Sequence, residues 1–310
     1  MQFKTLALAT TSLMALGLAT APVAQAKGPQ LMGEVELDVS YYWDDWSYGS
    51  EGSSSDYETE YTTLIGAGRV NIPYDEWYNL QLDVFGLAAL ADLDSAGVAG
   101  HFGGAAHINW RNPNIGLLGV AFGVGRANSD SIFWGKNAMT FLAALEGQWY
   151  CERWTFYGQV GYWDSDQNSF LLQNAGFLRG VVTYYGDPRW KISGALKYID
   201  GELTETSDFD YFVDSDSWDW NLRGDYLFGR SMPVATFLEV GGRYADTNFS
   251  SSSEAELDVF WVNVGVTFYL GGDGVSDLQY HDRNGASVDM PNFDEIRAPV
   301  FGYSIIDNVE

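Results

Sequence analysis

Histidine, cysteine and closely spaced carboxylates are the residues of this 310-residue chain that could do chemistry. His101 and His107 lie six residues apart in one alternating segment, and at ~3.3 Å per strand residue they are about 20 Å apart. That separation excludes a shared metal ion or a proton transfer between them. His281 lies near the C-terminus, and Cys151, the single cysteine, cannot form an intramolecular disulfide. With no nucleophile elbow, zinc spacing or phosphate loop, the sequence predicts no catalytic residue, metal site or cofactor.

The elements that must position any functional residue are twelve short segments of alternating polarity. In 256–270 one face carries Phe260, Val262, Val264, Val266, Phe268 and Leu270, and the other face is smaller and more polar. An apolar face of about ten residues spans a bilayer as a tilted strand but is too short for a helix. The expected strands are 33–43, 61–72, 78–91, 97–110, 114–125, 132–149, 154–163, 175–185, 189–199, 217–228, 234–245 and 256–270, with the register of 114–125 uncertain because both of its faces are apolar.

The connections between these strands alternate between two classes. Those after the even-numbered strands are tight turns, and most of those after odd-numbered strands are long and polar. Bacterial barrels have short periplasmic turns and longer outer loops, so an even strand count predicts that both termini are periplasmic. Aromatic residues concentrate near strand ends, as two interfacial girdles require.

The last segment also carries a signature. Asn263, Gly265, Phe268 and Leu270 follow the order polar, Gly, aromatic, apolar, which resembles the closing-strand insertion signal of Gram-negative outer-membrane β-barrel proteins. The resemblance is architectural, porin-like, and covers nearly the whole mature chain. It implies an all-β fold, an antiparallel up-and-down transmembrane barrel of about twelve strands, in the outer membrane, among its lipids and lipopolysaccharide. It also implies insertion by the barrel-assembly machinery and allows an oligomer.

The two ends of the chain lie outside the barrel. Residues 1–26 combine a short cationic start, an apolar run and the small-x-small sequence Ala24-Gln25-Ala26, so we expect a cleaved signal peptide for export to the periplasm. The barrel should occupy 27–270. Residues 271–310 lack useful strand alternation and form an extension that is either periplasmic, by default disordered, or docked in the lumen.

Charge separates the outer loops from the interior. The formal charge is −26, and two segments without Lys or Arg, Asp44–Glu60 and Asp200–Asp219, carry much of it. This balance excludes nucleic acid as a partner, because phosphate binding needs Lys and Arg clusters. The acidic loops could attract divalent cations, or they could simply be solvated.

If the apolar rows face lipid, charged residues of the opposite parity line the lumen. We expect an acidic wall of Glu36, Asp38 and Asp83, and a basic wall of Arg179, Lys191, Lys197, Arg223 and Arg243. Opposed walls would create a transverse field across a narrow pore, whereas ion pairs between them would fill a closed interior. Twelve strands lie between the eight that side chains fill and the sixteen that leave a channel.

The favoured function is therefore passive diffusion of small hydrophilic solutes. Two alternatives remain: a non-conducting structural or adhesive barrel that acts through its acidic loops, and an outer-membrane lipid hydrolase. We expect a non-enzyme, because no catalytic site can be assembled from the sequence.

Overall fold

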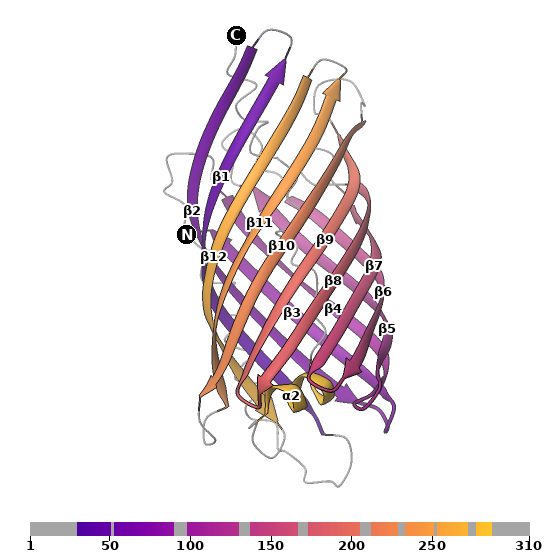
Figure 1. The fold of residues 1–310 in the computed structure, drawn as a ribbon. Coiled ribbons are helices and arrows are strands. Elements are labelled where there is room, and N and C mark those ends of the chain that lie inside the picture. Colours follow the sequence, from indigo (N-terminus) through magenta and orange to yellow (C-terminus); the bar gives the residue numbers. More distant parts are fainter. Residues whose placement is uncertain are drawn as a thin grey trace.

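The computed structural model is a closed barrel of twelve antiparallel strands (Figure 1). It describes residues 30–50, 53–89, 98–129, 137–166, 173–204, 212–228, 233–250, 253–271 and 277–286. The expected signal peptide, 1–26, lies outside these ranges. Each strand pairs with its neighbours in sequence, and the pairing of the first strand with the twelfth closes the barrel, with Val39 opposite Val264. The predicted fold class is therefore confirmed.

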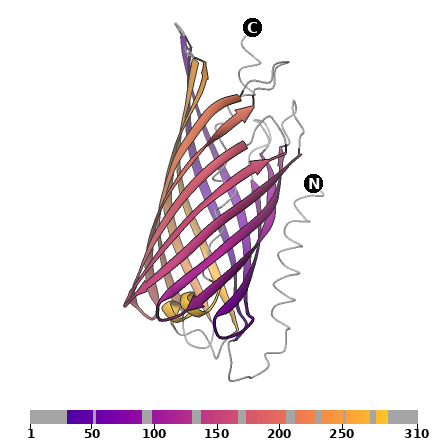
Figure 2. The same ribbon diagram turned by 90° about the vertical axis from the view of Figure 1, so that its right-hand side faces the viewer.

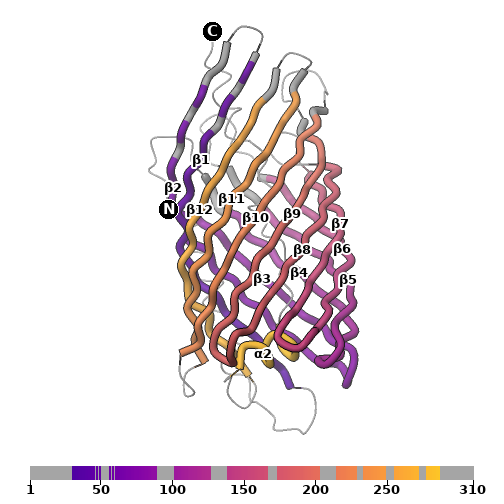
Figure 3. Tube along the Cα trace, in the orientation of Figure 1, coloured from indigo at the N-terminus to yellow at the C-terminus, as the bar shows by residue number. Residues whose placement is uncertain are grey.

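The strands follow the expected order and are mostly longer than predicted. They are β1 (Met32–Ser50), β2 (Ser53–Pro73), β3 (Tyr78–Ala89), β4 (Val98–Asn112), β5 (Gly116–Ser129), β6 (Asn137–Cys151), β7 (Trp154–Ser165), β8 (Gln173–Asp187), β9 (Trp190–Thr204), β10 (Phe212–Phe228), β11 (Val234–Ser250) and β12 (Ser253–Gly271). All are tilted in the same sense around the barrel (Figure 3).

Alternation of side chains between two environments explains why these segments form strands. In β12, Val264 and Phe268 are exposed on the outside while Trp261 and Tyr269 are buried inside. In β7 the burial alternates residue by residue over most of the strand. A hydrocarbon environment requires an outer surface as apolar as this one. It also requires that the backbone polar groups be paired, and strand pairing around the closed barrel satisfies them.

One end of the barrel carries the tight turns. Residues 74–77, 113–115, 152–153 and 188–189 connect strands there, as predicted. The fifth predicted turn, 229–233, lies mostly outside the described residues. We call this end the short-turn end.

At the opposite end two hairpins extend past the other strands (Figure 1). The ladder between β1 and β2 continues to Ser50 opposite Ser53, and that between β11 and β12 continues to Ser250 opposite Ser253. The expectation of long outer loops over Asp44–Glu60 and Asp200–Asp219 is therefore wrong. Residues 44–50 and 53–60 belong to β1 and β2, and residues 200–204 and 212–219 belong to β9 and β10. β1 also keeps its ladder with β12 throughout.

Aromatic side chains form two exposed bands. Trp149 and Trp154 lie on the outer surface near the short-turn end, and Tyr162 and Trp218 lie on it towards the other end. Not every aromatic residue near a strand end belongs to these bands. Tyr150, Tyr185 and Trp163 are buried on the inner face, because the alternation of side chains along a strand, and not the distance from its end, decides which way a ring points.

A short helix, α2 (Leu278–Asn284), lies across the mouth of the barrel at the short-turn end (Figures 1 and 2). The Asp277 side chain caps it by accepting a hydrogen bond from the backbone N–H of Tyr280, 3.1 Å away. This part of the predicted extension is ordered in the structure and docked on the barrel, so the default expectation of disorder is corrected for 277–286. No helix in the described ranges is long and apolar enough to cross a membrane.

Candidate functional site in the barrel interior

The side chains of all eight predicted wall residues lie on the inner face of the barrel. Five of them are buried, Glu36, Asp38, Asp83, Lys197 and Arg243, and Arg179, Lys191 and Arg223 are partly buried. The structure brings most of them into ion pairs with neighbours on the same side of the barrel. Acids and bases are therefore interspersed along the inner wall.

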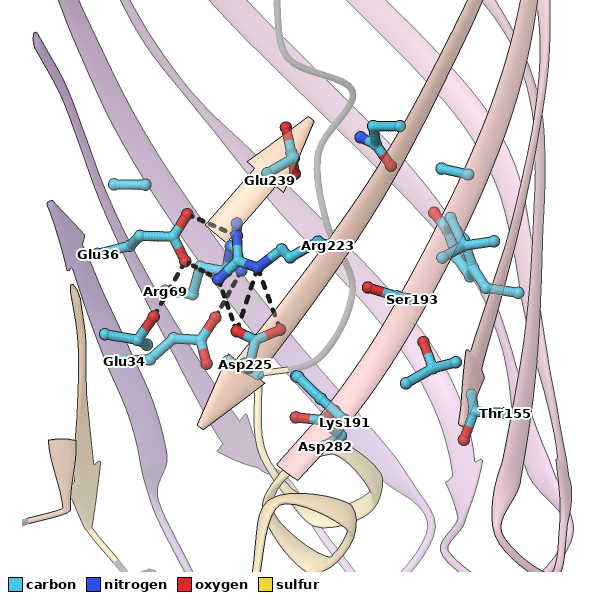
Figure 4. Close-up of a pocket in the computed structure, with 18 of the residues that line it drawn as sticks. Glu34, Glu36, Arg69, Thr155, Lys191, Ser193, Arg223, Asp225, Glu239 and Asp282 are labelled. Carbon is cyan, nitrogen blue, oxygen red and sulfur yellow. Dashed lines mark hydrogen bonds and ion pairs between the residues drawn. The ribbon is translucent and has the colours of Figure 1, made fainter. Parts of the chain in front are cut away.

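Arg223 on β10 is the centre of the largest of these clusters (Figure 4). Its Nη1 and Nη2 atoms donate to the two carboxylate oxygens of Glu36 on β1, at 3.0 and 2.8 Å. The same guanidinium donates to Asp225, and Thr267 donates to Glu36 at 3.2 Å. The guanidinium carbon lies 3.6 Å from the ring centroid of Phe237. This bidentate and stacked geometry is specific to arginine.

A second cluster follows directly from strand register. Asp219 on β10 lies opposite Lys197 on β9 and opposite Arg243 on β11. The Asp219 carboxylate accepts hydrogen bonds at 2.8 Å from both the Lys197 Nζ and the Arg243 Nε. All three side chains are buried, so the carboxylate compensates two cations that would otherwise repel each other.

His107 on β4 lies between two carboxylates. Its Nε2 is 3.2 Å from Asp83 on β3, and its Nδ1 is 3.0 Å from Glu146 on β6. Sequence reasoning did not predict Glu146 as a partner, because β4 and β6 are not adjacent and only the packing of the interior brings the two side chains together. His101 lies apart, with its ring against Phe85. Within the described residues no group of three or more His, Cys, Asp or Glu side chains has the arrangement of a metal site.

The interior also contains an apolar cluster. Its largest members are Trp163, Phe177, Leu142 and Ile199, each at most 5% exposed, and Phe85 packs against them. They come from β3 and from β6 to β9, so side chains from well-separated strands meet there. Part of the lumen is therefore filled by packed apolar side chains rather than by water.

Between the Arg223 cluster and helix α2 lies a polar cavity of about 150 Å³. Its lining combines the charged groups with hydroxyl and amide side chains, among them Thr155, Ser193, Asn221 and Asn263. Asp282 and Ala286, from α2 and the two residues that follow it, form its floor at the short-turn end (Figure 4).

Helix α2 is held in the mouth by Asp282. Its carboxylate accepts hydrogen bonds at 2.8 Å from the Lys191 Nζ and from the Tyr185 hydroxyl. Burial alone would raise the pKa of Asp282, but Lys191 and His281 together hold it below its usual range. Lys191 was predicted as a lumen base, and its partner proves to be a residue of the extension.

Apolar and backbone contacts complete the docking. Leu278 is fully buried in a cluster with Tyr185 and Tyr269, and the His281 ring packs edge-on against Tyr269. Arg283 donates to the backbone carbonyl oxygens of Glu152 and Trp154 at 2.9 and 3.0 Å. Arg111 donates to the carbonyl of Gly285. The tight turns and strand ends thus form a preformed seat for the helix.

The four residues of the predicted insertion signal lie on β12, the strand that closes the barrel. Gly265 and Asn263 face the interior and Phe268 faces outward, on the strand that pairs with β1. Leu270 is partly buried, next to the last residue of β12. Their role in insertion remains a prediction.

Comparison with known proteins supports the fold. The structure of an outer membrane channel from Pseudomonas putida F1 matches with a TM-score of 0.50 and 12% identity, covering 81% of this chain and 98% of that one. A Pseudomonas aeruginosa FadL homologue matches with a TM-score of 0.44, 11% identity and coverages of 76% and 90%. The KdgM porin, solved in complex with disordered oligogalacturonate, matches at 0.40, 10% identity and coverages of 74% and 98%.

No family model and no curated protein matches the sequence. At these identities the similarity concerns the fold alone. This fold and the apolar exterior define the class of structure: a closed antiparallel β-barrel of twelve strands, similar in fold to the outer membrane channel from Pseudomonas putida F1.

Proposed function

We propose that this protein is a channel of the Gram-negative outer membrane for passive diffusion of small hydrophilic solutes. The observation that carries the proposal is the cavity inside the barrel, lined by paired charges, hydroxyls and amides. Such a lining can replace the hydration of a polar solute. The expected export signal and the loop lengths support an orientation with both termini in the periplasm.

In this proposal the structure represents a closed state. Helix α2 lies across the short-turn end of the cavity and is held mainly by the Lys191 and Tyr185 contacts of Asp282. Passage of solute requires the helix to leave its seat or shift within it. Because 277–286 follow the last strand, such a movement needs no change in the barrel itself.

A non-conducting structural barrel is the second candidate. The observation in its favour is the packed cluster around Trp163 and Phe177, which fills part of the lumen. We do not propose the lipid hydrolase. His107, the histidine with two close carboxylate partners, is fully buried in the interior, away from the lipid-facing surface.

Single-channel recording separates the first two candidates. The purified full-length protein is reconstituted in planar bilayers, and its conductance is compared with that of a variant with Gln279→Cys. This residue donates to the carbonyl of Glu152, next to the native Cys151, so a short bifunctional thiol reagent can tether the helix to its seat. We expect openings in the untethered protein and their loss on tethering. No openings under any condition would favour the structural barrel.

A further inference from the structure

Oxygen acceptors concentrate in one corner of the polar cavity, where β1, β12 and β11 meet. Asn263 lies opposite Ser40 on one side and opposite Glu239 on the other, and Asp38 lies two residues before Ser40. All four side chains are on the inward parity of their strands, and Asp38, Glu239 and Asn263 line the cavity. Figure 4 shows Glu239 near Arg223 at the side of this cluster.

Several of these acceptors have no partner among the described residues. Asp38 is 4% exposed and its Oδ1 makes no hydrogen bond, and the same holds for Asn263 Oδ1 and Ser40 Oγ. The Asn263 side chain donates a hydrogen bond to Asp38, so the amide oxygen of Asn263 remains available. A buried carboxylate oxygen that lacks a hydrogen-bond donor is costly, so this arrangement calls for a bound donor or positive charge.

The neighbouring base, Arg223, acts on Asp38 only through space and not through a hydrogen bond. Arg223 uses its guanidinium for Glu36 and Asp225. The cavity as a whole is lined by six acids and four bases, namely Glu34, Glu36, Asp38, Asp225, Glu239 and Asp282 against Arg69, Arg179, Lys191 and Arg223. Four of the six acids, Glu34, Glu36, Asp225 and Asp282, form ion pairs with Arg69, Arg223 or Lys191, and Asp38 lies in the corner with the unpaired oxygens.

We propose that this corner, built from Asp38, Ser40 and Asn263, binds a compact monovalent cation, either an inorganic ion or the ammonium group of a larger solute. Carboxylate, amide and hydroxyl oxygens are the ligands that such hard cations prefer. A divalent or transition metal does not fit as well, because the described residues contain no group of three or more His, Cys, Asp or Glu side chains arranged to hold one.

This site deepens the proposed function, on which its role in transport rests. A cation-binding site beside the cavity makes the conducting pathway prefer cations to anions. The same site can recognise the ammonium group of a hydrophilic solute. The Arg223 cluster next to it combines one cation with two carboxylates, and its net negative charge acts in the same direction.

The binding itself is tested by crystallography with thallous ion, which replaces potassium and scatters anomalously. We expect an anomalous peak within coordination distance of Asp38 and Asn263 in the full-length protein, and its loss in Asp38→Asn. Asp45→Asn is the matched control, because Asp45 lies on the same strand with its side chain exposed on the outer face. This change should leave the peak intact. The absence of a peak in the unchanged protein would overturn the proposal.

The consequence for transport is tested by reversal potentials in a potassium chloride gradient. We expect a preference for potassium that falls severalfold in Asp38→Asn and is unchanged in Asp45→Asn. Added methylammonium should compete in the unchanged protein only. Asp38→Asn removes a buried charge with an unpaired oxygen and should not lower heat resistance, so a folded variant is available for the comparison.

The two proposals fail in different ways. A thallium peak in a protein that never conducts would leave the cation site standing and overturn the channel. Conductance with an unchanged potassium preference in Asp38→Asn, together with no peak, would leave the channel standing and overturn the site. In that case the corner holds water or a neutral carboxylic acid.

Discussion

At the scale of single residues, the interior is organised by charges that compensate one another in rows across adjacent strands. Asp219 lies between Lys197 and Arg243 and accepts a hydrogen bond from each at 2.8 Å. Two buried cations therefore depend on one carboxylate. Breaking such a buried group by removing one partner is strongly destabilising, by about 3–5 kcal/mol.

We expect Asp219→Asn to lower the resistance of the folded barrel to heat. The amide keeps the volume but not the charge, so both cations lose the carboxylate that they share. The measurement is the temperature at which the folded, fast-migrating band is lost on unboiled gels. Asp216→Asn, on the outward parity of the same strand, is the matched control and should behave like the unchanged protein. Equal heat resistance of the two variants would contradict this account of the interior.

The sequence predicted which charged residues face inward but not which ones pair. Alternation within a strand shows which side chains share a face, and it correctly placed Lys197 and Arg243 on the inner face of the barrel. Pairing depends on the register between strands, and a single sequence does not contain it. The contact of His107 with Glu146 is harder still to predict, because it joins strands that are not adjacent.

At the scale of elements, helix α2 depends for its position on contacts with the strand ends and turns of the barrel. Asp282 makes its principal side-chain contacts with the barrel, to Lys191 and Tyr185. A seven-residue helix has little intrinsic stability, so it persists only while docked. Loss of the Asp282 charge should therefore release the helix rather than deform the strands.

We expect Asp282→Asn to increase channel opening and to speed the reaction of Cys151 with thiol reagents in the purified protein. Cys151 precedes Glu152, whose carbonyl accepts from Gln279 and Arg283 while the helix is docked. Asp277→Asn, which retains a capping side chain, should leave both readouts close to those of the unchanged protein. Identical labelling rates in all three proteins would show that Asp282 does not hold the helix.

The same contact sets the pH dependence of docking. Because Lys191 and His281 hold the pKa of Asp282 below its undocked value, ionisation of this carboxyl favours docking. Its contribution is complete above the ordinary Asp pKa of about 4 and declines as the pH falls from there towards the depressed pKa. Opening by acid should therefore begin only below about pH 4. Asp282→Asn should lack this component.

A further prediction concerns the closing strand, β12, and membrane insertion. Gly265 faces inward, where a side chain would meet the Phe237 ring and Asp38, and Phe268 faces outward at 40% exposure. We expect Gly265→Asp and Phe268→Asp to block insertion while leaving export intact, the latter because an acid on the lipid face costs up to a few kcal/mol. The measurement is the amount of folded protein in outer-membrane fractions. Tyr269→Phe, which keeps the buried ring, is the control.

The lengths of the elements were less predictable than their order. The alternating pattern indicated twelve strands, and the tight turns were placed correctly. The sequence predicts a loop over 44–60 because this segment carries six carboxylates and no Lys or Arg. Its strand structure comes from ladder pairing with β12 and from contacts such as the stacked rings of Tyr42 and Tyr61, which are not visible in local composition.

At the scale of the whole molecule, the two ends of the barrel differ in shape and charge. The short-turn end is compact and seals against α2, whereas the other end carries the extended hairpins. On the outer face of the β1–β2 hairpin, Asp45 lies opposite Glu58, and Asp258 of β12 is next to them. Such an acidic surface cannot lie in hydrocarbon, so the membrane must end below it, near the exposed aromatic band.

This asymmetry predicts the orientation in the membrane. Long, acidic hairpins belong to the cell surface and tight turns to the periplasm, so Cys151 should be inaccessible from outside. We expect an impermeant thiol reagent to leave Cys151 unlabelled on intact cells and to label it once the outer membrane is opened. Placing the cysteine at the tip of the β1–β2 hairpin, with Ser53→Cys in a Cys151→Ser background, should reverse the result. Labelling of Cys151 on intact cells, without labelling at 53, would place the short-turn end and helix α2 outside, and the proposed direction of closure would have to be inverted.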